Sequence, residues 1–162
     1  MGISLFHILV VDDYDPWRRF CSTTLDGQAE LQVVGEAANG LEAVRAAEEL
    51  HPDLILLDIG LPIIDGIEAA RRIRGVSPHS RILYISAGHS RDMAEEVLRT
   101  GADGYLIKSE TAQGELLGAV RTVLRGQRYV SASLKLQDPA GSPVEGVAED
   151  AEAPQPVASI LL

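Results

Sequence analysis

Five polar side chains with possible catalytic chemistry come directly after short apolar runs of the sequence. They are Asp12, Asp13, Asp58, Ser86 and Lys108. An aspartate in such a place most often lies in a solvated turn or caps a helix. A lone serine or lysine there is even weaker evidence of a function. Three carboxylates brought together, however, repel one another unless they share a cation. Whether these residues form a functional site therefore depends on whether the fold brings them together.

Phosphoryl transfer to a carboxylate is the chemistry that such a group of side chains would support. Mg²⁺ takes hard oxygen ligands, usually one or two carboxylates, and keeps waters and a phosphate oxygen. A lysine would add a second positive charge and a serine a hydrogen bond, and phosphoryl transfer needs mainly positioning and charge stabilisation. A carboxylate nucleophile is ionised at neutral pH and needs no general base. The four histidines include no ligand-spaced pair, which disfavours zinc.

The elements that would position these residues alternate along the chain. Unbroken apolar runs at 8–11, 54–57, 82–85 and 105–107 are typical of strands covered on both faces, and the more polar segment 31–37 indicates an edge strand. Helical segments are predicted from Asp15-Pro16, with Asp15 as N-cap, and at 39–50, 65–74, 90–100 and 111–124. Gly101 and Gly126 follow the last two, where left-handed C-caps are common.

Five β-α units in succession predict an α/β fold, a doubly wound five-stranded parallel sheet of the flavodoxin-like type. The strand order 2-1-3-4-5 is taken from the known example of that fold. Ligand sites in such sheets form at the carboxyl ends of the strands, where all five polar side chains above are placed. The sequence therefore predicts one crevice that holds three carboxylates, a hydroxyl and an ammonium group.

Composition limits the function classes. The 162 residues carry a formal net charge of -10, which argues against direct DNA binding. Residues 1–131 are expected to form the domain, and residues 132–162 an acidic, proline- and alanine-rich tail that is disordered. No apolar stretch is long enough to cross a membrane, no secretion signal is visible, and the single cysteine, Cys21, suits a cytoplasmic location.

Four spaced motifs give the sequence a resemblance to a known family. They are Val10-Val11-Asp12-Asp13, Leu57-Asp58-Ile59-Gly60-Leu61-Pro62 with Asp65-Gly66, Ser86-Ala87, and the segment from Gly101 to Lys108. Over residues 6–130 the chain resembles the receiver domains of bacterial two-component response regulators.

The resemblance implies that Asp58 accepts a phosphoryl group from a phosphohistidine on a sensor histidine kinase or a histidine phosphotransfer protein. The cofactor would be Mg²⁺, bound directly by Asp13, Asp58 and the backbone carbonyl of Gly60, and through water by Asp12. The chain would then be a phosphoacceptor that assists its own phosphorylation and dephosphorylation, not an enzyme acting on other substrates.

The same resemblance assigns the remaining site residues. Lys108 would pair with the phosphoryl group, and Ser86 would swing toward it. Tyr105 would be the coupled aromatic that turns inward; without the resemblance it is a half-buried strand residue. Ser109 stands where many receivers have proline.

The segment 126–131 resembles receivers that precede a helix-turn-helix domain, but only 31 residues follow it, acidic overall, which are too few for one. A stand-alone receiver is favoured over a fragment, and phosphorylation would be read by a downstream protein partner or by homodimer formation.

Two other function classes stay open. The first is an interaction scaffold with the same fold that is never phosphorylated. The second is an aspartyl-phosphate phosphatase of the haloacid-dehalogenase type, which needs a second aspartate two residues after the nucleophile. Gly60 occupies that position and disfavours the second class.

Overall fold

A computed structural model describes residues 5–88, 91–99, 101–111, 113–132 and 134 of the chain. Residues 135–162 of the predicted tail lie outside the described residues. None of the described helices is long and apolar enough to span a membrane.

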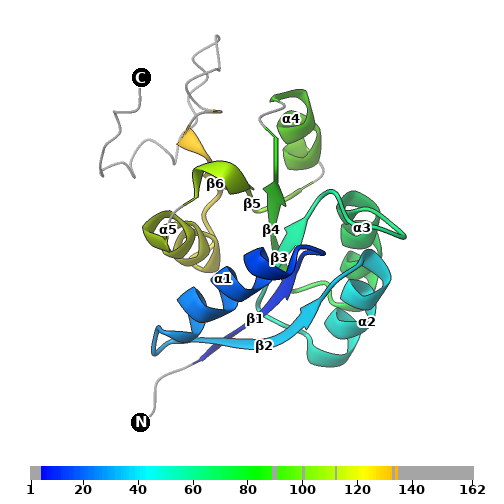
Figure 1. Cartoon of the computed structure of the whole chain (residues 1–162). Helices are drawn as coiled ribbons and strands as arrows, with labels where there is room; N and C mark the ends of the chain where they lie inside the picture. Colours follow the sequence, from blue (N-terminus) through cyan, green and yellow to red (C-terminus); the bar gives the residue numbers. More distant parts are fainter. Residues whose placement is uncertain (1–4, 89–90, 100, 112, 133, 135–162) are drawn as a thin grey trace.

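A parallel sheet forms the middle layer of the domain (Figure 1). Its order is β2-β1-β3-β4-β5-β6. The strands are β1 (Phe6–Val11), β2 (Leu31–Ala37), β3 (Leu54–Asp58), β4 (Arg81–Ser86), β5 (Gly104–Ile107) and β6 (Tyr129–Val130). The predicted order of the first five strands and the edge position of β2 are confirmed.

The prediction of five strands was wrong by one, because β6 pairs with β5. Two residues are too short to show an apolar run or an alternation. Backbone hydrogen bonds define the strand: the Tyr129 N–H donates to the Asp103 carbonyl at 3.2 Å and the Ser131 N–H to the Tyr105 carbonyl at 3.0 Å. The buried Ser131 hydroxyl accepts from the Ile107 N–H at 2.8 Å, and Leu134 is buried as well. Packing therefore continues to the last described residue.

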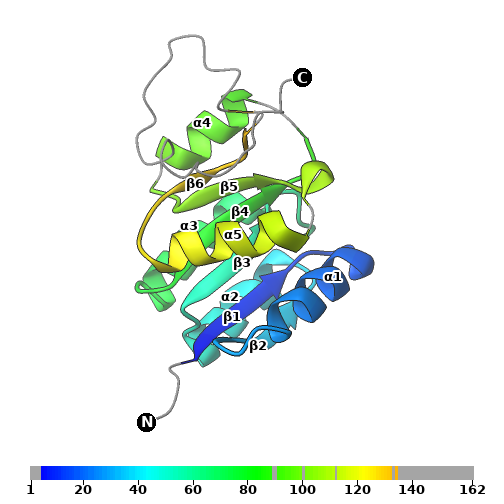
Figure 2. The same cartoon turned by 90° about the vertical axis from the view of Figure 1, so that its left-hand side faces the viewer.

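Helices cover both faces of the sheet, as Figures 1 and 2 show together. Helices α1 (Asp15–Asp26) and α5 (Gln113–Leu124) pack against one face, where Ile8 and Val10 point. Helices α2 (Gly40–Leu50), α3 (Gly66–Val76) and α4 (Arg91–Arg99) lie on the other, with Leu9 and Val11. Successive strand residues point to opposite faces, so an unbroken apolar run is what two covered faces require.

The helix ends agree with most of the predicted signals. The side chains of Asn39 and Asp65 cap α2 and α3 by accepting from backbone N–H groups three residues on, at 2.9 and 2.8 Å. Gly101 and Gly126 have φ of 96° and 87°, as predicted for C-caps. The predicted cap Asp15 was wrong by one residue, because Tyr14 is the N-cap of α1.

The segment before α5 also differs from the prediction. Helix α5 begins at Gln113 and not at Thr111, since Lys108–Glu110 form a 3-10 turn. The Thr111 hydroxyl donates to the Ile107 carbonyl at 2.7 Å and holds this turn against the end of β5. The turn fixes the backbone of Lys108 at the carboxyl edge of the sheet.

Candidate functional site

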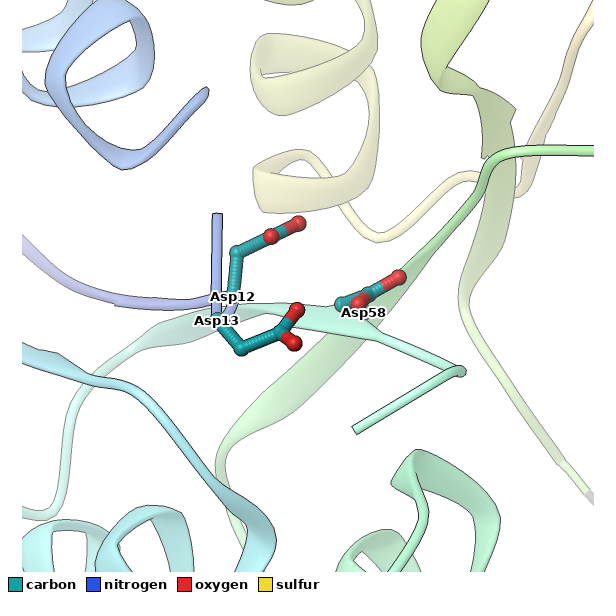
Figure 3. A group of neighbouring side chains, drawn as sticks. All are labelled: Asp12, Asp13 and Asp58. Atoms are coloured by element: carbon teal, nitrogen blue, oxygen red, sulfur yellow. The ribbon is translucent and has the colours of Figure 1, made fainter. Parts of the chain in front are cut away.

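Three carboxylates meet at the carboxyl ends of β1 and β3. Asp12 and Asp13 follow β1, and Asp58 is the last residue of β3. One carboxylate oxygen from each lies within 4.8 Å of the others, and Figure 3 shows the Asp13 carboxylate directed toward Asp58. Asp12 is fully buried and Asp58 is 6% exposed, whereas Asp13 is open to solvent. The sequence-predicted cluster therefore exists as one site.

Both carboxylate oxygens of Asp12 accept hydrogen bonds. Its Oδ1 accepts from the Tyr14 N–H at 2.8 Å, and its Oδ2 accepts from the Lys108 ammonium group at 2.7 Å. Its backbone carbonyl accepts from the Arg18 guanidinium at 2.7 Å. Since both of its oxygens are engaged, Asp12 is less available to a cation than Asp13.

Lys108 reaches the site from the carboxyl end of β5, two strands away from β3. Besides its ion pair with Asp12, its Nζ lies 5.4 Å from the centre of the Trp17 ring, within range of a cation–π contact. Trp17 is 7% exposed and belongs to the core on the α1 and α5 face of the sheet. The ammonium group is thus positioned beside the carboxylates by an ion pair and an aromatic face.

Ser86 and Tyr105 lie on the neighbouring strands β4 and β5. Ser86 ends β4, and its hydroxyl accepts from the Gly88 N–H at 3.2 Å, within its own loop. Tyr105 is fully buried, not half-buried, and its hydroxyl makes no hydrogen bond. Burial raises the pKa of the Tyr105 phenol, against a smaller lowering effect of the nearby Ser86 side chain. The switch roles implied for both residues stay predictions.

The loop after Asp58 turns back tightly onto it. The Gly66 N–H donates to the Ile59 carbonyl at 2.8 Å, and a Cβ on Gly66 would lie 2.2 Å from the Asp58 carbonyl oxygen. Only glycine fits there, so the tight turn after Asp58 requires it. Gly60 is exposed, and its backbone lowers the pKa of the Asp58 carboxyl; the role of its carbonyl as a ligand stays a prediction.

The surroundings of Asp58 destabilise the ionised form of its carboxyl group. Burial first, and then the charges of Asp12 and Asp13, raise the pKa of the Asp58 carboxyl to about 6, against the lowering effect of Lys108 and the Gly60 backbone. The group is therefore mostly ionised at neutral pH, as predicted, but its charge is destabilised. A cation bound between the carboxylates would relieve this repulsion.

We expect this raised pKa to make metal-free stability depend on pH. The folded pKa of about 6 exceeds the ordinary value near 3.8, so the folded state binds more protons between those pH values. The free energy of unfolding of the wild type should therefore fall, relative to Asp58→Asn, by about 1–2 kcal/mol as pH rises from 4 to 7. Urea unfolding in EDTA at both pH values measures this. Parallel pH curves for the two proteins would contradict it.

Sequence reasoning missed one residue of the site, Arg18. Its guanidinium donates to the Asp12 carbonyl, to Glu36 at 3.0 Å and to Asp15 at 2.6 Å, and so fixes the loop after β1 against α1 and β2. The only signal was its spacing of three residues from Asp15 on a predicted helix, which ordinary surface ion pairs share.

The family assignment follows from comparison with known proteins. Residues 8–121 match the family model described as the response regulator receiver domain, and the chain belongs to that family.

Particular relatives agree with this assignment. The chain is 35% identical over 133 residues to the response regulator GacA of Pseudomonas viridiflava, a match that covers 82% of this chain and 62% of that protein. It is similar to the crystal structure of a LuxR-family two-component response regulator from Aurantimonas sp. SI85-9A1, with a TM-score of 0.78 and 34% identity over 88% of this chain and all of that one. A CheX–CheY–BeF₃⁻–Mg²⁺ complex from Borrelia burgdorferi also matches, with a TM-score of 0.68 and 26% identity over 73% of this chain and 88% of that one.

Proposed function

We propose that this receiver domain is switched by phosphorylation of Asp58, with Mg²⁺ as cofactor. The observation that carries the proposal is the meeting of three carboxylates within 4.8 Å, beside the Lys108 ammonium group at the carboxyl edge of the sheet. No single member of this set would support it. The related structure from Borrelia, which holds Mg²⁺ and a beryllofluoride group, adds support from outside the chain.

The reaction itself requires little of the protein beyond placement. An oxygen of the Asp58 carboxylate attacks the phosphorus of a phosphohistidine, the P–N bond breaks, and the imidazole leaves with the bonding electrons and takes up a proton. No general base is needed because the nucleophile is ionised. The phosphodonor would be a sensor histidine kinase or a histidine phosphotransfer protein in the cytoplasm. The chain is then a phosphoacceptor that assists the reaction and not an enzyme in the usual sense.

The donor set fits Mg²⁺, because its oxygen ligands are hard, one carboxylate is open to solvent, and Asp58 lies within reach. Asp13 and Asp58 would bind the ion directly, with the Gly60 carbonyl, and Asp12 through a water. Once bound, the ion would supply positive charge against the incoming phosphoryl oxygens. Lys108 would turn from Asp12 toward the phosphoryl group, and the Ser86 hydroxyl would donate to it.

Phosphorylation should depend strictly on a divalent cation. With acetyl phosphate and Mg²⁺ we expect intact-protein mass spectrometry to show one added phosphoryl group, and none when EDTA replaces Mg²⁺. Asp13→Asn removes the open ligand and should raise the Mg²⁺ concentration for half-maximal labelling by about tenfold or more. Equal labelling with and without the metal would contradict the proposal. So would a folded wild type that is not labelled at all, which would favour an unphosphorylated scaffold.

The output would pass to another protein. Phosphorylation at Asp58 would move Ser86 and Tyr105, and a downstream protein partner or a second copy of the chain would bind the changed surface. β6 lies along β5 in this structure, so a homodimer through that edge would have to accommodate it.

A further inference from the structure

Ile63 is an unusual residue in the loop between β3 and α3. Its φ is 75°, in the left-handed region that β-branched residues rarely adopt, and its side chain is 68% exposed. It is the most exposed large hydrophobic residue among those that the structure describes. Both features are unfavourable, because the backbone is strained and an aliphatic side chain faces water.

Contacts on both sides hold this loop in place. One end is closed by the Gly66 N–H bond to Ile59, and the Pro62 carbonyl accepts from the Gly40 N–H at 3.4 Å. A Cβ on Gly40 would lie 2.3 Å from the carbonyl oxygen of Ile64, so α2 and the loop are in close contact. The loop is thus held on both sides of position 63, where the backbone has a positive φ. Asparagine or glycine would adopt this φ with less strain, so the fold does not explain isoleucine.

Ile63 also lies on a loop that carries the site. The loop starts directly after Asp58 and returns to it at Gly66. Tyr14, 59% exposed, is the second most exposed large hydrophobic, and its own N–H binds Asp12. Tyr14 also lines a shallow depression together with Lys108. The two most exposed hydrophobic side chains of the described residues thus stand on the two loops that carry the carboxylates.

We propose that Ile63, with Tyr14, is the apolar contact surface for the protein that donates the phosphoryl group. This inference rests on the proposed function, since a phosphohistidine must be brought to Asp58 between these loops. The carboxylates repel anions, and an apolar rim would supply binding that does not depend on charge. The donor would present aliphatic or aromatic side chains around its phosphohistidine. A small phosphodonor needs no such contact.

The test uses Ile63→Asn, which tolerates a positive φ and removes the apolar side chain. Transfer from an autophosphorylated sensor histidine kinase that labels the wild type should slow about tenfold in kcat/KM, mainly through KM. Labelling by acetyl phosphate should be unchanged. The melting temperature should rise by about 2–4 °C because strain is relieved. Ile63→Leu keeps an apolar side chain and should transfer nearly as the wild type does.

Leu5→Asn is the matched control, because Leu5 is exposed and apolar but precedes β1 at the opposite end of the sheet. It should leave both phosphodonors unaffected. Unchanged kinase transfer by Ile63→Asn, equal slowing with both donors, or a lower melting temperature would overturn the inference. Failure of the proposed function is distinct, since then acetyl phosphate would not label even the wild type.

Discussion

Replacing Asp58 with asparagine is expected to reduce phosphorylation by acetyl phosphate to background, a loss of at least about a hundredfold. The amide keeps the shape of the side chain but lacks the ionised oxygen that attacks phosphorus. The variant should still fold, because it removes a charge that burial and Asp12 destabilise. Intact-protein mass spectrometry with Mg²⁺ present measures the loss.

Asp92→Asn is the control for this experiment. Asp92 is an exposed carboxylate in the first turn of α4, so its removal alters the net charge by the same amount. We expect it to be labelled as the wild type is. Full labelling of Asp58→Asn would place the acceptor elsewhere and refute the assignment.

Gly66→Ala should have the largest effect on stability of the substitutions considered. The new Cβ would lie 2.2 Å from the Asp58 carbonyl oxygen and 2.8 Å from the Ile59 Cα, backbone atoms of the last residue of β3 and of the buried residue after it. We expect the free energy of unfolding to fall by about 3 kcal/mol, measured in urea. Phosphorylation should fall with it, since the Asp58 backbone must shift.

Gly75→Ala gives a matched comparison in the same helix. Nothing lies within 4 Å of a Cβ at Gly75, so alanine there should stabilise α3 by about 0.5–1 kcal/mol through helix propensity. Opposite signs for the two substitutions would confirm that close approach, and not helix propensity, requires Gly66. Equal changes would contradict the tight turn at Asp58.

The positions of the site residues could be predicted because the fold places them by a simple rule. Short apolar runs mark buried parallel strands, and parallel strands bring their carboxyl ends to one edge. Asp12, Asp58 and Lys108 therefore met as expected, although they are far apart in sequence. The caps Asn39 and Asp65 carry equally local signals.

Other features could not be predicted from the sequence because they depend on long-range packing. The strand Tyr129–Val130 exists only because β5 offers an unpaired edge, and two residues carry no periodicity of their own. The positive φ of Ile63 lies in a loop whose other residues contact Gly40 and Gly66, and isoleucine gives no hint of it. The pairing of Lys108 with Asp12 is likewise a matter of geometry, since every carboxylate of the cluster was a possible partner.

These details change the understanding of Asp58. It is a buried carboxylate with a raised pKa, whose negative charge a bound cation would stabilise. Lys108 pairs with Asp12 in this structure, and under the proposed function it would exchange this partner for the phosphoryl group. The exchange would link events at Asp58 to the end of β5, two residues beyond Tyr105.

Site-specific trapping of the phosphoryl group is the most direct test of the central claim. After incubation with acetyl phosphate and Mg²⁺, borohydride reduction converts an aspartyl phosphate to homoserine, which peptide mass spectrometry locates. We predict homoserine at position 58 and at no other aspartate, and none in samples with EDTA. Homoserine at another position, or a folded and metal-loaded wild type that yields none, would contradict the account.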